Sequence, residues 1–293
     1  MVKLARNDIK TREVLDWKGL HIFHYAMSSC SQKLRIFLNL KKIPWESHEL
    51  DLLNNENISE WYLGINPRGL VPVLVHDGDV HIESNDILLY LEKHFPSPAL
   101  IPPHAEAEMA QMLEQEDELH LDFRALSFRF MFNPPETPKT AQVLDIYEKS
   151  GSGTVDGVAD ARKARELNFW RKYAIEGVTD ATAYAAGQKF KAAFSALDAR
   201  LAAHKYLLGE DISLLDIAWF IYVNRLKTAG YPIKRLHPRL ATWFDLLAQD
   251  PAFAQEIQVP PPLRAAIDET HRQQKAEGKT LEAVAGLWAP ELS

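Results

Sequence analysis

The first residues that could do chemistry are the run Ser28-Ser29-Cys30-Ser31, which stands between a β-branched, aromatic stretch and a helical one. A helix N-terminus presents amide N–H groups without partners and a partial positive charge, so it stabilises a thiolate of the protein or of a bound ligand. Serine hydroxyls beside it can donate a hydrogen bond to that sulfur. The same run is equally compatible with a capping serine followed by a buried, inert cysteine.

Two further motifs have both a functional and a structural interpretation. Val71-Pro72 opens a strand, where a cis peptide bond would expose the backbone groups of Val71 to an extended ligand; an edge-strand proline is the structural alternative. Glu83-Ser84 precedes a helix. Ser84 can hold a carboxylate at the helix end and Glu83 can pair with an ammonium, so together they would bind a free α-amino acid group. An ordinary N-cap with an acidic neighbour is the alternative.

One motif is interpreted as structural, and metal-binding motifs are missing. Ser213-Leu-Leu-Asp216 is a capping box before an apolar helix. The 11 histidines include no His-Glu-x-x-His, and the single cysteine cannot supply a multi-thiolate site. We therefore expect no structural or catalytic metal.

The elements that would position these residues divide the chain into two parts. Residues 1–18 are polar and aperiodic and are interpreted as an N-terminal extension. Residues 19–95 alternate short apolar runs, turns and amphipathic stretches in the order βαβ-ββα. Residues 96–104 hold four prolines and are interpreted as an extended linker. Residues 105–293 show helical periodicity, including one long amphipathic helix over 105–132.

These patterns predict an α+β fold with a smaller mixed domain at 19–95 and an all-α domain at 105–293. A stretch at 133–161, rich in proline, serine and glycine, is expected to form a long loop of the helical domain.

Composition excludes several classes of protein. The chain has 293 residues, a net charge of −7, 46% hydrophobic residues and one cysteine, which rules out a disulfide scaffold. Its basic residues are scattered, so we expect no nucleic-acid partner. No apolar run is long enough for a membrane span and none resembles a secretory signal, so we expect no membrane partner and a cytoplasmic location.

Together, the order and spacing of the motifs resemble the cytosolic glutathione S-transferase superfamily. The segments at 28–38, 66–74, 83–92 and 213–216 carry the resemblance. It implies a thioredoxin-like domain that binds glutathione as co-substrate, with no metal. It further implies a helical domain that shapes the pocket for a small, hydrophobic, aromatic electrophile, and a homodimer.

The resemblance also assigns residues of the glutathione site. The family's cis-proline corresponds to Pro72, so Val71 would pair its backbone with the cysteinyl part of glutathione. Glu83 and Ser84 correspond to the pair that binds the γ-glutamyl group. Leu70 departs from the pattern, because many relatives have Gln or Lys there.

The catalytic assignment involves Ser28, Ser29 and Cys30. This signature most resembles the zeta class, which includes maleylacetoacetate isomerases, and the hydroquinone reductive dehalogenases; other segments resemble bacterial β-aryl ether-cleaving enzymes. Conjugation, isomerisation, reductive dehalogenation, ether cleavage and a non-catalytic binding role all remain open. A thioredoxin-type disulfide oxidoreductase is disfavoured, because Lys33 stands where a resolving cysteine would follow Cys30.

Overall fold

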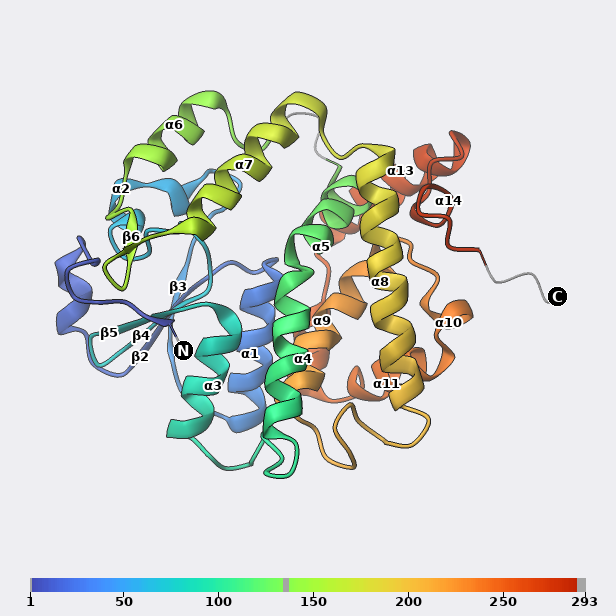
Figure 1. Ribbon diagram of the computed structural model, residues 1–293, viewed down its shortest axis with the longest axis horizontal. Helices are drawn as coiled ribbons and strands as arrows, with labels where there is room; N and C mark the ends of the chain where they lie inside the picture. Colours follow the sequence, from blue (N-terminus) through green and yellow to red (C-terminus); the bar gives the residue numbers. More distant parts are fainter. Residues whose placement is uncertain (1, 134–136, 289–293) are drawn as a thin grey trace. The chain divides into compact units, whose positions relative to one another are not determined.

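The computed structural model describes residues 2–133 and 137–288, which form two compact units (Figure 1). Unit 1 lies within Met1–Pro96 and Glu136–Gly177, and unit 2 within Ser97–Pro135 and Val178–Ser293. The chain therefore leaves unit 1, returns to it and leaves it again.

Unit 1 is built on a five-stranded mixed sheet in the order β1-β5-β4-β2-β3. Only β2 and β3 are parallel, and the other neighbours are antiparallel. The strands are β1 (Val2–Lys3), β2 (Leu20–His24), β3 (Glu46–Glu49), β4 (Val73–His76) and β5 (Asp79–Ile82).

The helices of unit 1 complete the expected order. Helices α1 and α3 pack against each other beside the sheet (Figure 1). Helices α1 (Ser29–Lys41) and α2 (Glu60–Leu63) lie between strands, α3 (Ser84–His94) follows β5, and the short 3-10 turns are η1 (Arg12–Asp16) and η2 (Glu56–Ile58). The βαβ-ββα order of the thioredoxin-like fold is confirmed.

Residues 2–18 are part of this fold, and the interpretation of 1–18 as an extension is wrong for them. Strand β1 pairs antiparallel with β5. Leu4, Ile9, Val14 and Leu15 are buried in one hydrophobic cluster with Phe23 of β2. The sequence hid this role because apolar residues in irregular backbone have no helical or strand period.

The stretch expected as a loop at 133–161 is largely ordered and belongs to unit 1; residues 134–136 lie outside the described part. It contains α6 (Ala141–Lys149) and a hairpin of β6 (Thr154–Val155) and β7 (Val158–Ala159), and α7 (Ala161–Glu176) follows it. We call residues 137–177 the inserted segment. Thr154 Oγ1 donates to Asp8 Oδ1 at 2.6 Å, which joins the hairpin to the N-terminal residues.

Unit 2 contains helices only among its described elements, so the expected fold class is confirmed. The long helix expected over 105–132 is divided into three pieces. The elements are α4 (Glu106–Glu118), α5 (His120–Ser127), a π-helical turn η3 (Phe128–Phe132), α8 (Asp180–Arg200), α9 (Leu214–Thr228), α10 (Ile233–Leu236), α11 (Pro238–Leu247), α12 (Pro251–Ala254), η4 (Gln255–Ile257), α13 (Pro261–Ala276) and α14 (Leu281–Val284).

The capping box at the start of α9 is confirmed. The carboxylate of Asp216 accepts from the backbone N–H and hydroxyl of Ser213, at 2.9 and 2.7 Å. It also accepts from the Leu207 amide and the Trp243 indole, both at 2.9 Å. Burial raises the pKa of Asp216, and these hydrogen bonds oppose that rise.

In the described part of the chain, no helix is both long and apolar enough to span a bilayer.

A buried histidine of β5 makes the stability of unit 1 depend on pH. The ring of His81 packs against Tyr90 in a tilted arrangement with centroids 3.8 Å apart, and burial lowers the pKa of His81 to about 4. The unfolded chain therefore binds more protons than the folded one between pH 6.5 and about 4. Stability is retained above this window and is lost as the pH falls through it.

We expect the free energy of unfolding to fall by about 3 kcal/mol across that window from His81 alone. Urea denaturation as a function of pH should show a shallower dependence for His81→Phe than for the unmodified protein. Equal slopes would show that His81 does not titrate in this way.

Candidate functional site

The run Ser28 to Ser31 lies at the N-terminal end of α1, as the sequence predicts. Ser28 is the N-cap, and its side chain accepts a hydrogen bond from the Ser31 amide at 3.4 Å. Ser29 is buried, and Cys30, the second residue of the helix, is partly exposed. The first amides of a helix have no partner within it, so this end can stabilise a negative charge.

The turn that leads into α1 is fixed by Arg35, from the second turn of that helix. Its guanidinium donates to the carbonyls of Tyr25 and Ala26, at 3.3 and 2.8 Å. It also lies 3.2 Å from Nδ1 of His24. Burial and the charge of Arg35 lower the pKa of His24 to about 4, so this ring is neutral near pH 7. Sequence analysis did not identify Arg35 as a positioning residue.

The peptide bond between Val71 and Pro72 is cis, as the family resemblance implies. Side chains hold the turn before this peptide bond by donating hydrogen bonds to the backbone carbonyl oxygens of the turn. Tyr62 Oη and Asn66 Nδ2 both donate to the Leu70 carbonyl, at 2.6 and 2.8 Å, and Asn57 Nδ2 donates to the Gly69 carbonyl at 2.6 Å. Among the described residues, no hydrogen bond engages the backbone of Val71, so it can accept a ligand strand.

Helix α3 begins one residue earlier than expected. Glu83, not Ser84, occupies the N-cap position, and it has a φ of 69°, a conformation that non-glycine residues rarely adopt. Ser84 is the first helical residue and is partly exposed. The interpretation of Ser84 as the cap is therefore wrong, but its amide is one of the first donors of the helix, where an anion would bind.

A buried lysine joins the N-terminal ends of α1 and α3. Nζ of Lys33 donates to Oδ1 of Asn85 at 3.0 Å. Lys33 is only 1% exposed. The run Ser28 to Ser31 and the pair Glu83-Ser84 thus stand at two helix ends that one hydrogen bond links. The sequence pattern distinguishes Lys33 only as the residue in place of a resolving cysteine.

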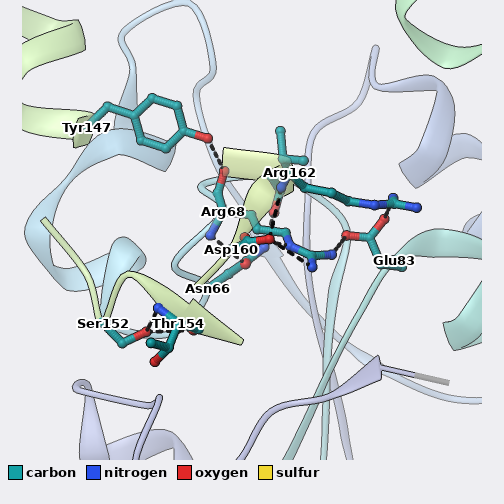
Figure 2. A network of polar contacts seen from close by, with 9 residues as sticks. Asn66, Arg68, Glu83, Tyr147, Ser152, Thr154, Asp160 and Arg162 are labelled. Carbon is teal, nitrogen blue, oxygen red and sulfur yellow. Dashed lines mark hydrogen bonds and ion pairs between the residues drawn. The ribbon is translucent and has the colours of Figure 1, made fainter. Parts of the chain in front are cut away.

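Figure 2 shows a network of four charged side chains: Arg68, Glu83, Asp160 and Arg162. Arg68 binds Asp160 through Nε and Nη2, at 2.8 and 3.1 Å. Its Nη1 also pairs with Glu83, and the second Glu83 oxygen pairs with Arg162. Tyr147 donates to the Arg68 carbonyl. Two cations and two anions therefore balance in this network.

Arg68 is the best-anchored member of the network. Burial on its own would lower the pKa of Arg68, but the hydrogen bonds and charges of Asp160 and Glu83 raise it. Its amide also donates to Asn66 Oδ1 at 3.0 Å, which fixes the turn. Sequence analysis missed Asp160 because it stands in the stretch interpreted as a loop, and missed Arg162, at the start of the next helical stretch, because both residues are far from Glu83 along the chain.

Two family models match the chain. The glutathione S-transferase N-terminal domain matches residues 27–94, and the glutathione S-transferase C-terminal domain matches residues 161–246. Together they cover more than half of the chain and contain the motifs at both linked helix ends. The chain belongs to the glutathione S-transferase superfamily. Helix α7 lies in the inserted segment and in unit 1, but it also belongs to the residues that the C-terminal domain model matches.

Individual relatives of this chain match different shares of its length. A zeta-class glutathione S-transferase of Euphorbia esula is 42% identical over 83 residues, 28% of this chain and only 37% of the relative. A probable maleylacetoacetate isomerase of Caenorhabditis elegans is 28% identical over 75% of this chain and 87% of the relative. The crystal structure of the β-etherase LigF from Sphingobium sp. strain SYK-6 is 25% identical, with a TM-score of 0.66 over 81% of this chain and 98% of that one.

The charged network should contribute to the stability of unit 1. We expect Asp160→Ala to lower the free energy of unfolding by about 3 kcal/mol, because it leaves part of a buried guanidinium without its partner. Urea denaturation measures this.

Glu148→Ala is the matched control, since it removes an exposed ion pair with Arg171 from the same inserted segment and should change stability little. Equal losses in the two variants would contradict a special role for the network.

Proposed function

We propose that this chain is a glutathione transferase that binds glutathione in unit 1 and uses its thiolate to attack a small aromatic electrophile. The observation that carries the proposal is the 3.0 Å hydrogen bond between Lys33 and Asn85. It links a helix end suited to a thiolate with a helix end suited to a carboxylate, so both belong to one extended site.

The thiol of glutathione would lie at the N-terminal end of α1. The Ser28 hydroxyl accepts from the Ser31 amide, so its own proton is available for the sulfur. The helix dipole and the buried ammonium of Lys33 add positive charge nearby. Each of these effects favours the thiolate over the thiol, so the pKa of the bound thiol should fall.

The γ-glutamyl end of glutathione would lie at Glu83 and Ser84. This group carries one ammonium and one carboxylate, so it can join the balanced network without adding net charge. The ammonium would pair with Glu83, and the carboxylate with the Ser84 amide and with Arg162. Arg162 is suited to change partner, because 36% of its side chain is exposed, against 9% for Arg68.

The middle of glutathione would pair with the backbone of Val71, as the family resemblance implies for the residue before Pro72.

In the chemical step, the thiol proton leaves to solvent and the sulfur forms a bond to the electrophilic carbon. The bond from that carbon to its leaving group breaks, and the leaving group takes the electron pair. The product is a thioether. We also propose that the protein forms a homodimer.

Cleavage of a β-aryl ether is the second candidate, favoured by the similarity to a β-etherase of known structure. The sulfur would attack the ether carbon and a phenolate would leave.

A reductive outcome needs Cys30: its thiolate attacks the sulfur of the thioether, the carbon takes a proton, and a second glutathione releases Cys30 from the mixed disulfide. Isomerisation is the reaction named for the nematode relative, and a non-catalytic binding protein is the alternative from another class.

The substrate class is tested with a glutathione-dependent screen of chlorinated hydroquinones, β-aryl ethers and maleylacetoacetate, applied to the unmodified protein, Ser28→Ala and Cys30→Ser. We expect thioether formation, and a loss in kcat/KM of at least about tenfold in Ser28→Ala from the missing donor. Cys30→Ser should retain conjugation and ether cleavage and lose any dehalogenation. Retention on glutathione resin without turnover of any compound would contradict a transferase, and unchanged dehalogenation in Cys30→Ser would exclude the reductive role.

The role of Arg162 is tested by steady-state kinetics with varied glutathione. We expect Arg162→Leu to raise the KM for glutathione about tenfold and to change kcat little, because the carboxylate contact is the same in the ground and transition states.

Arg165→Leu is the matched control, since Arg165 is an exposed arginine of the same helix. A KM that is unchanged in Arg162→Leu, or equally raised in Arg165→Leu, would show that Arg162 does not bind glutathione.

A further inference from the structure

A second group of reactive side chains lies on β2 and β3, on the sheet face of Phe23. His21 pairs in register with Glu46, and Phe23 pairs with His48. Side chains alternate along a strand, so His21, Glu46 and His48 all lie on this one face. Strand β3 is at the edge of the sheet. Nothing in the proposed glutathione chemistry uses these three residues.

Their donor atoms are close enough to hold one metal ion. His21 Nδ1 lies 3.1 Å from His48 Nε2 and 3.5 Å from a carboxylate oxygen of Glu46. The other Glu46 oxygen lies 3.9 Å from His48 Nε2. Tetrahedral zinc with bonds of about 2.0 to 2.1 Å keeps its ligand atoms roughly 3.3 to 3.4 Å apart. The three separations lie on both sides of that value, so small side-chain rotations suffice.

The orientation of His21 is that of a metal ligand. Its Nε2 lies 2.8 Å from the Lys18 carbonyl, which can only accept, so Nε2 carries the proton and Nδ1 has a lone pair. A ligating histidine commonly donates its other N–H to a backbone carbonyl in this way. Trp17 contacts both rings: it stacks on His48 with centroids 4.8 Å apart and packs at a tilt against His21 with centroids 4.6 Å apart. These contacts hold the two imidazoles before an ion arrives.

The group is also open on one side. The side chain of His21 is 10% exposed, that of His48 is 25% exposed and that of Glu46 is 67% exposed. An ion can therefore enter past Glu46 and reach the more buried nitrogens. Two imidazoles and one carboxylate are a ligand set that zinc accepts, with water at a fourth position.

We propose that His21, Glu46 and His48 form a Zn²⁺ site that joins the edge strand β3 to β2. The ion replaces the proton shared between the two imidazoles and neutralises the carboxylate. No sequence motif predicts this site, because its ligands come from two strands and match no helical metal motif. None of the three residues is part of the proposed glutathione site.

The test uses full-length, tag-free protein, treated with a chelator and titrated with Co²⁺ and then with Zn²⁺. We expect one Co²⁺ per chain with the visible absorption of a tetrahedral ion, and loss of that absorption when Zn²⁺ displaces it. Zn²⁺ should also raise the Tm, because it binds the folded chain.

Two variants locate the ion, and a third serves as control. Glu46→Gln and His48→Gln should each weaken Co²⁺ binding at least tenfold, since even changes outside the ligand set cost about 10- to 100-fold. Glu49→Gln removes an exposed carboxylate from the opposite face of β3 and should bind normally. No tetrahedral Co²⁺ signal in the unmodified protein, or binding that survives in both ligand variants, would overturn the proposal.

Discussion

The buried guanidinium of Arg68 is the constraint on which unit 1 depends. Arg68 belongs to the turn before Val71. Its guanidinium donates two hydrogen bonds to Asp160 and pairs with Glu83 at the start of α3. The guanidinium of an arginine is planar and always charged, so its partners must be positioned to match its donor groups. One side chain thus sets the position of the turn, the entry to a helix and the beginning of α7 together.

This constraint explains why the inserted segment belongs to the thioredoxin-like unit. The segment supplies Asp160 as a partner for Arg68 and Arg162 as a partner for Glu83. The proposed glutathione site would thereby include Arg162, a residue from a later part of the chain. In the proposed complex, Arg162 would recognise the γ-glutamyl group with a cation that the motifs of the N-terminal domain do not contain.

Sequence reasoning succeeded where local pattern determines structure. The capping serine, the position of Cys30 and the strand after Pro72 all follow from residue types within a few positions. It failed where long-range contacts decide. The links from Lys33 to Asn85 and from Glu46 to His21 join residues that only the folded sheet and helices bring together. Contacts between residues far apart in the sequence leave no periodic pattern. The placement of the inserted segment in unit 1 and the histidine cluster therefore could not be predicted.

The central claim is that the N-terminal end of α1 stabilises a glutathione thiolate. Titration of the bound thiol, followed by thiolate absorbance in the ultraviolet, tests it most directly. The account predicts a pKa at least about one unit below the usual thiol value near 8.5, and a return toward that value in Ser28→Ala. A bound thiol that titrates like free glutathione in the unmodified protein would contradict the account.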